Sequence, residues 1–127
     1  MKKNAQKSKA PEPEDFLPLT PAMFHVLLAL ADKERHGYEV MQEVQERTEG
    51  SVRLGPGTLY GSIKRMLAEG LVAESDDRPD PEFDDERRRY YRLTDFGYRV
   101  AKAESERLAS LLKSARAKKL LSRAGDT

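Results

Sequence analysis

The chain has 127 residues, enough for one domain with a core of its own, although a partner subunit could complete a core of this size. It contains no cysteine, which excludes disulfides and thiolate metal sites and makes the cytoplasm the expected location. No apolar run approaches the roughly 18 residues of a membrane span, so a membrane partner is not expected. The formal net charge of +1 neither favours nor excludes nucleic acid, because DNA binding depends on local positive surface.

The chain divides into four segments by composition. Residues 1–15 are polar and lysine-bearing with almost nothing to bury, and we expect a disordered tail that either touches DNA loosely or only aids solubility. Residues 16–93 should form a DNA-binding domain, residues 94–120 a C-terminal dimerisation helix, and residues 121–127 a flexible tail.

Two helices are expected at the start of the folded region. Thr20 and Pro21 favour a helix start, and the apolar residues 22–31 that follow predict a helix buried on most sides. A second helix should run from His36 to about Thr48, with an outer face too acidic to lie along a phosphate backbone. The side chains of this helix expected to face the core are Tyr38, Met41 and either Val40 or Val44.

The third helix is the most informative segment for function. It should begin at Gly55 and Pro56, because a proline in the first turn loses no intrahelical hydrogen bond, and Gly70 can end it at positive φ. One side carries an apolar stripe, and the other carries small, hydroxyl and cationic side chains suited to phosphates and base edges. An ordinary surface helix with solvated cations is the alternative. The residues predicted to contact DNA are Thr58, Tyr60, Gly61, Ser62, Lys64 and Arg65.

A β-hairpin is expected next, from two short β-rich segments at residues 71–74 and 89–93. Eight acidic residues lie between Glu74 and Glu86, so we expect the hairpin tip to stay away from DNA. Three arginines follow at the base of the hairpin, where they could reach phosphates or the minor groove, or could instead neutralise the neighbouring acids. These arginines are Arg87, Arg88 and Arg89.

The last helix should be capped by Thr94 and Asp95 and run for roughly 25 residues. Its apolar stripe is sparse, and so small a domain offers little surface to cover it. Pairing with the same helix of a second subunit is therefore expected, with a partly frayed single helix as the alternative. The predicted dimer interface consists of Val100, Ala101, Leu108, Leu111, Leu112 and Ala115.

Catalytic and metal sites find little support in the sequence. His25 and His36 are too far apart for a metal pair on one helix and have no nucleophile beside them. Residues 55–58 lack the length and the lysine of a phosphate-binding loop, and Pro81 stands where a calcium loop beginning at Asp76 would need its glycine. We therefore expect no enzyme, no catalytic residues, no metal and no cofactor.

Four motifs together resemble one protein family. They are His36-Gly37-Tyr38-Glu39, Gly57-Thr58-Leu59-Tyr60, Glu69-Gly70-Leu71 and Arg89-Tyr90-Tyr91-Arg92-Leu93-Thr94. In this order and spacing they are similar to the PadR-like transcriptional regulators, over about residues 17–112. The resemblance implies a winged helix-turn-helix, mostly α with a small β-hairpin, and a two-fold dimer built through one long C-terminal helix.

The resemblance also implies a function. Members of the family usually repress nearby promoters, and some release DNA when a small aromatic or drug-like effector binds, although this sequence names no effector. The expected function is a homodimeric repressor that binds double-stranded DNA at a palindromic operator, in the cytoplasm at the nucleoid. The alternative is a winged helix that serves as a protein-interaction module and docks through its acidic wing.

Overall fold

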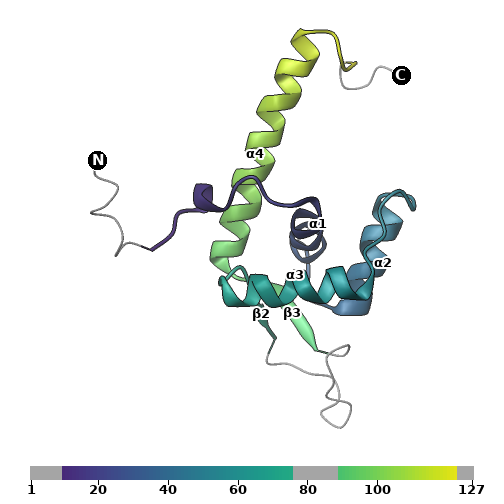
Figure 1. The fold of residues 1–127 in the computed structure, drawn as a ribbon, viewed down its shortest axis with the longest axis vertical. Helices are drawn as coiled ribbons and strands as arrows, with labels where there is room; N and C mark the ends of the chain where they lie inside the picture. The colour runs from purple at the N-terminus through teal and green to yellow at the C-terminus, as the bar shows by residue number, and fades with distance from the viewer. Residues whose placement is uncertain (1–9, 76–88, 123–127) are drawn as a thin grey trace.

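The computed structural model describes residues 10–75 and 89–122, so the predicted hairpin tip and both ends of the chain lie outside it. Within these residues, four α-helices pack together with a small three-stranded antiparallel sheet that lies at one edge, and the last helix is much the longest (Figure 1). The fold class predicted from the sequence, mostly α with a small hairpin and a long C-terminal helix, is confirmed.

The first two helices begin as their capping residues predict. In α1, Pro21–Leu30, the Thr20 hydroxyl accepts a hydrogen bond from the Met23 amide at 3.1 Å. In α2, Gly37–Arg47, the Nδ1 atom of His36 accepts from the Glu39 amide at 3.2 Å, and the Glu39 carboxylate accepts from the His36 amide at 3.1 Å. This reciprocal pair satisfies amides that the first turn cannot satisfy itself. His36 is thus a helix cap.

The buried side of α2 differs in one residue from the prediction. Val40 and Val44 are both fully buried, where the sequence predicted one or the other, whereas Tyr38 is 56 % exposed. The reason is the position of Gly37, which is also buried and defines the core-facing side together with the two valines. Because successive residues in a helix are rotated by about 100°, the side chain after Gly37 must point away from that side.

The third helix, α3, spans Pro56–Ala68 and ends as predicted. Gly70 adopts a φ of 80°, and its amide donates to the Leu67 carbonyl at 3.2 Å. The Leu71 amide donates to the Met66 carbonyl at 2.9 Å. These two bonds turn the chain directly into the sheet, because a residue with positive φ reverses its direction after a helix.

The sheet contains one strand that the sequence did not predict. Strands β2, Val72–Glu74, and β3, Tyr90–Leu93, form the expected hairpin, with Val72 opposite Leu93. On the other edge of β3 lies β1, Arg35–His36, with Arg35 opposite Tyr91. Two residues are too few to show a strand periodicity, which is why β1 is visible only in the folded chain.

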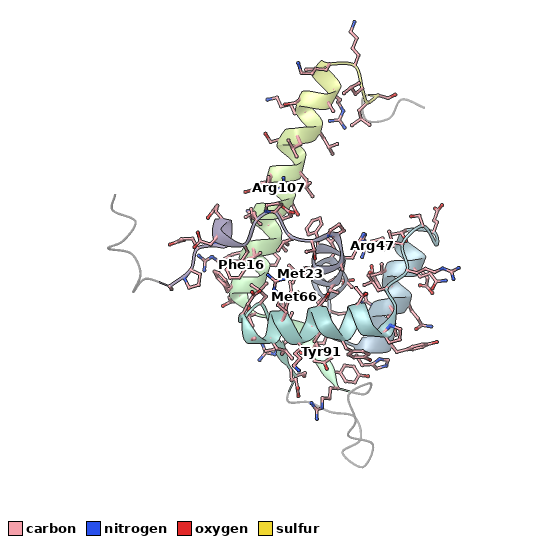
Figure 2. The ribbon with its side chains drawn as sticks, viewed as in Figure 1. Phe16, Met23, Arg47, Met66, Tyr91 and Arg107 are labelled. Carbon is pink, nitrogen blue, oxygen red and sulfur yellow. The ribbon has the colours of Figure 1, made fainter. Side chains whose placement is uncertain are left out.

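The core lies where α1, α3 and the sheet meet. Figure 2 labels Met23 of α1, Met66 of α3 and Tyr91 of β3 in this region, and all three are at least 95 % buried. Alternation along β3 brings Tyr91 and Leu93 to the core side and leaves Arg92 exposed. The opposite side of α3 therefore remains available at the surface.

The segment before α1 has regular structure at residues that the sequence assigned to the tail. Pro13–Phe16 form a short 3₁₀ helix, η2, which packs against the last helix, α4, Asp95–Ala117. Pro13 is buried, and the Phe16 and Phe96 rings meet edge to face with centroids 5.5 Å apart. The sequence predicted a disordered tail through residue 15, whereas in the structure these residues have an apolar partner on α4. Residues 1–9 lie outside the described chain.

A buried carboxylate fastens the same segment to α4. Glu104 is 2 % exposed, and its Oε2 accepts a hydrogen bond from the Leu19 amide at 3.0 Å. Arg107 donates to both carboxylate oxygens, at 2.6 and 3.1 Å. The hydrogen bonds from Arg107, and secondarily the Leu19 amide, lower the pKa of Glu104 below its usual 4.5 against the opposing effect of burial.

We expect Glu104→Ala to destabilise the domain by about 1–3 kcal/mol, because it leaves a buried amide without its acceptor. Since the pKa of Glu104 is lower in the folded state, its ionised contribution is complete above about pH 4.5 and is lost as the pH falls through the folded value. Denaturant unfolding at pH 7 and at pH 3 measures both effects. Glu106→Gln, an exposed change on the same helix, is the control; an equal loss at both pH values would contradict the ionised role.

The last helix leaves the domain halfway along its length (Figure 1). Val100 and Ala101, predicted to lie in a dimer interface, instead pack into the core of their own subunit, where they are 0 and 7 % exposed. The reason is that η2 and α1 cover the first half of α4. Beyond residue 108 only Ala115 is even partly buried among the described residues, and Leu111 and Leu112 are 55 and 47 % exposed.

Candidate nucleic-acid interface

The outer face of α3 is the candidate DNA-reading surface. Its apolar stripe, Leu59, Ile63 and Met66, is at least 98 % buried and holds the helix against the core. The opposite side is fully at the surface and consists of Gly57, Thr58, Gly61, Lys64, Arg65 and Ala68. An added Cβ at Gly57 or Gly61 would meet no atom within 4 Å. The face is therefore both open and shallow, which permits close approach of a duplex.

Two of the predicted DNA-contact residues do not lie on this face. The Tyr60 ring packs over Gly37 at the start of α2, and its hydroxyl is buried. A Cβ on Gly37 would overlap that hydroxyl and lie 2.6 Å from the Cζ atom of Tyr60, so the two motif residues fit only as a pair. Ser62 is half-buried on the α1 side. The predicted surface is thus narrower than the sequence suggests, because Tyr60 serves packing.

The charged side chains on the α3 face are two cations, and one of them forms an ion pair. Lys64 is exposed, whereas the Arg65 guanidinium contacts the Glu69 carboxylate at 3.3 Å, one turn further along the helix. The Arg65 side chain remains 62 % exposed. Such an exposed pair is worth little in water, so phosphate can replace the carboxylate at small cost.

A shallow groove of about 420 Å³ borders the face on the α1 side. The start of α1 forms one wall through Thr20 and Ala22, and Thr58, Gly61 and Arg65 of α3 form the other. This places the first turn of α1 beside the candidate reading face, which the sequence did not indicate.

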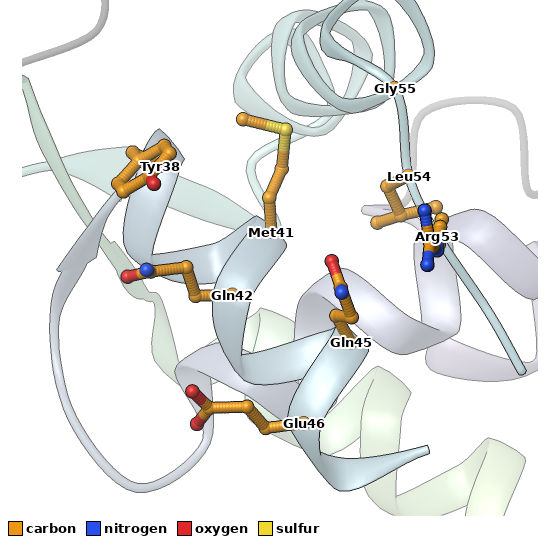
Figure 3. A pocket seen from close by; sticks show the side chains of 8 residues that line it. All are labelled: Tyr38, Met41, Gln42, Gln45, Glu46, Arg53, Leu54 and Gly55. Carbon is orange, nitrogen blue, oxygen red and sulfur yellow. The ribbon is translucent and has the colours of Figure 1, made fainter. Parts of the chain in front are cut away.

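A second groove, of about 530 Å³, lies on the other flank between α2 and the chain leading into α3 (Figure 3). Tyr38 and Gln42 of α2 line it together with Arg53 and Gly55 of the chain leading into α3. Tyr38 is a candidate contact that the sequence analysis placed in the core. Its signal was present in the sequence, since its neighbour Gly37 marks the buried side of the helix.

The acidic character of α2 is largely turned away from α3. Glu39 belongs to the helix cap, and Glu43 pairs with Arg47 at 2.9 Å. Arg47 in turn donates to the His25 carbonyl at 3.4 Å and lies 3.2 Å from its Nδ1 atom, so these groups tie α2 to α1. Partial burial and then the Arg47 charge lower the pKa of His25. The side of α2 next to α3 is mostly uncharged, with Glu46 as the acid that lines the groove.

The base of the hairpin is only partly described. Arg89 forms an ion pair with Glu74 across β2 and β3 at 3.3 Å, which agrees with the neutralising alternative for this residue. Arg87 and Arg88 lie outside the described residues, together with the acidic tip. Arg92 points to the surface of β3 and is a further candidate that the sequence analysis did not select.

Residues 10–75 and 89–122 hold no cluster of three or more histidine, cysteine or acidic side chains that could bind a metal. Over the same residues, none of the helices combines the length and apolar character needed to cross a bilayer.

Comparison with known proteins identifies the family. Residues 26–103 match the profile of the transcriptional regulator PadR-like family. The chain belongs to the PadR-like family. This confirms the resemblance drawn from the four motifs and the expectation of a regulator family in place of an enzyme family.

The proteins similar to this chain include named transcriptional regulators. A transcriptional regulator of Mycobacterium tuberculosis, Rv3488, is 39 % identical over 83 residues, which cover 65 % of this chain and 70 % of that protein. A PadR family transcription regulator of Clostridium difficile superposes with a TM-score of 0.64 at 26 % identity, covering 77 % of this chain and 97 % of that one. An uncharacterised transposon protein of Streptomyces fradiae is 36 % identical over 90 residues, 71 % of this chain.

The matched regions differ in how much of each relative they cover. The chain spans 24 % of the Streptomyces transposon protein and 63 % of a Lysinibacillus sphaericus protein that is 33 % identical over 73 residues, 57 % of this chain. The chain thus spans less than two thirds of the length of each of these two proteins.

Proposed function

We propose that this PadR-like chain is a sequence-specific DNA-binding regulator, a repressor that works as a homodimer on a palindromic operator in the cytoplasm, at the nucleoid. The observation that carries the proposal is the open face of α3. Gly57 and Gly61 keep the helix surface low, while Thr58, Lys64 and Arg65 supply a hydroxyl and two cations at the surface. This combination suits a helix that enters the major groove.

The flanks of α3 supply positions for phosphate contacts. The exposed residues Tyr38 and Arg53 lie beside one end of the helix, and Arg92 lies at the surface of the neighbouring hairpin. Phosphate contacts set the position of a protein on DNA, and base contacts set the sequence that it prefers. We extend the proposal to Arg87 and Arg88 from their place in the sequence alone.

The projecting half of α4 supports the homodimer. Leu108, Leu111, Leu112 and Ala115 lie on one side of this helix, and no element of residues 10–75 or 89–122 covers them fully. A two-fold dimer would place its two α3 helices about 34 Å apart, so the operator should contain half-sites about 10 base pairs apart or a multiple of that.

The direct test is the double substitution Lys64→Ala and Arg65→Ala. Each cation that neutralises a phosphate contributes about 0.9 to the slope of log affinity against log salt, so the double variant should bind all DNA more weakly with a slope flatter by about 2. Fluorescence anisotropy at several salt concentrations, on DNA upstream of the chain's own gene, measures both quantities.

Two further variants separate the α3 face from general charge effects. Lys102→Ala removes an exposed cation on α4 and should leave binding unchanged. Glu69→Gln releases Arg65 from its ion pair and removes a negative charge beside the face, so it should tighten binding. Wild-type affinity and salt slope in the double variant would show that DNA does not contact α3.

A further inference from the structure

The groove between α1 and α3, which has a volume of about 420 Å³, is lined by hydroxyl groups and one cation. None of the eight residues around it is acidic, whereas the groove on the other flank of α3 contains Glu46 beside Arg53. Its hydroxyl and charged side chains come from both helices and are Thr20, Thr58, Ser62 and Arg65. An anion in this groove would therefore meet hydrogen-bond donors on both walls and no like charge.

The three hydroxyl groups of the groove are available to donate hydrogen bonds. The Thr20 hydroxyl accepts from the Met23 amide at 3.1 Å, and a hydroxyl that accepts keeps its own proton for another partner. Within residues 10–75 and 89–122, none of the three hydroxyls donates a hydrogen bond. Thr20 and Thr58 are exposed, and Ser62 is half-buried. Hydroxyl donors of this kind commonly contact phosphate oxygens in protein–DNA complexes.

Both walls of the groove are held in place by contacts on their far sides. On the α1 side, Leu19 is 8 % exposed and its amide donates to the Glu104 carboxylate at 3.0 Å, so the residue before Thr20 is anchored on α4. On the α3 side, the buried apolar stripe fixes the helix against the core. A groove whose walls are already in position loses little conformational entropy when it is occupied.

We propose that this groove receives the sugar–phosphate backbone of one DNA strand, with Thr20 donating a hydrogen bond to a phosphate that Arg65 neutralises. The inference rests on the proposed function and adds α1 to the elements that contact DNA. A helix inserted in the major groove has one sugar–phosphate backbone on each side. Because Gly57 and Gly61 line both the groove and the outer face of α3, the backbone on the α1 side would pass over this groove.

Replacing Thr20 with aspartate and with asparagine tests the contact. Both residues cap a helix at least as well as threonine, and they differ from each other by one charge at nearly equal size. Thr20→Asp should bind DNA about tenfold more weakly than Thr20→Asn at low salt, because two like charges about 4 Å apart repel each other by an energy of this order. The difference should shrink as the salt concentration rises.

Fluorescence anisotropy measures these affinities on two probes, the DNA upstream of the chain's own gene and a duplex of unrelated sequence. Both probes should show the same loss, because a phosphate contact does not depend on sequence. Thermal melting of the two variants shows that the cap and the fold are retained. Lys102→Ala lowers the net charge by the same one unit on α4 and should leave binding unchanged.

A cation added to the α1 wall should have the opposite effect. Ala22 lines the groove, and a lysine at this position could extend its ammonium group along it. Ala22→Lys should bind both probes more tightly, with a slope of log affinity against log salt that is steeper by about 0.9. Ala117→Lys adds the same charge at an exposed position in the last turn of α4 and should leave the slope unchanged. Equal slopes for Ala22→Lys and the wild type would contradict the inference.

The remaining outcomes distinguish this inference from the proposed function. If Thr20→Asp and Thr20→Asn bind equally while the Lys64→Ala and Arg65→Ala double variant binds weakly, DNA contacts α3 but not the groove, and only the inference is overturned. A loss in Thr20→Asp on the upstream DNA alone would place Thr20 against a base and overturn the phosphate contact. A loss of equal size in Lys102→Ala would assign the effect to total charge and overturn it as well. If the wild type binds neither probe at low salt, the inference and the proposed function both fail.

Discussion

Replacing Gly97 with alanine should lower the free energy of unfolding by about 3 kcal/mol or more, because overpacking against fixed backbone forces the chain to move. A Cβ at this position would overlap the carbonyl oxygen of Leu71 and lie 2.8 Å from its carbonyl carbon. Both atoms belong to backbone at the start of the sheet, which cannot rotate away as a side chain could. Urea unfolding followed by circular dichroism measures the loss, and a variant that fails to accumulate as folded protein would be its extreme form.

Gly61→Ala is the matched control for this prediction. It adds the same methyl group to the exposed side of α3, where no atom lies within 4 Å, and alanine favours a helix over glycine by about 1 kcal/mol. Stability should therefore rise slightly, while operator affinity should fall if the α3 face lies against DNA. If Gly97→Ala unfolded at the wild-type urea concentration, the close contact between α4 and Leu71 would not exist in solution.

Leu112→Ala should dissociate the proposed dimer about a thousandfold more readily than the wild type. The substitution removes two leucines from a two-fold interface, and truncating a buried leucine costs at least about 2 kcal/mol each time. Operator binding should weaken at low protein concentration although no residue near DNA has changed, because the dimer must form first. Sedimentation equilibrium and anisotropy over a range of protein concentrations measure the two effects.

Leu120→Ala provides the same chemical change beyond the end of α4. Leu120 is 77 % exposed and follows the end of α4, so its truncation should leave both dissociation and DNA binding close to wild type. Equal behaviour of the two variants would argue that the projecting half of α4 holds no partner. Full stability of the single subunit in Leu112→Ala is expected in either case, because Leu112 is 47 % exposed there.

Gly97 and Leu112, the positions of the two main substitutions, lie toward opposite ends of α4. The start of α4 is joined to the end of α3, since the Thr94 hydroxyl donates to the Gly70 carbonyl at 2.6 Å and the Thr94 amide donates to the Leu71 carbonyl at 3.1 Å. Gly97 completes this joint by letting α4 touch the same turn. A rigid joint would fix the angle between α4, the proposed dimerisation helix, and α3, the proposed DNA-reading helix, as the proposed palindromic operator of fixed spacing requires.

Local sequence determined most of the secondary structure of this protein. Capping by Thr20, the Gly55-Pro56 start, the turn at Gly70 and the cap at Thr94 all occur as predicted. These signals act within one helical turn, so no distant contact is needed to express them. The motifs carry the family assignment for the same reason, because each one forms a local turn or cap that the fold uses directly.

Only the tertiary structure decided which side chains reach the surface. Tyr60 lies on the side of the third helix that the sequence pattern predicts to be polar and exposed. Its ring nevertheless packs over Gly37, twenty-three positions earlier in the chain, where the absence of a side chain leaves room for it. Val100 and Ala101 belong to the same stripe as Leu112, but η2 and α1 cover the first half of α4 and leave the second half exposed. The burial of a side chain depends on which distant segments of the chain pack against it. The periodic pattern of apolar residues along one helix does not identify those segments.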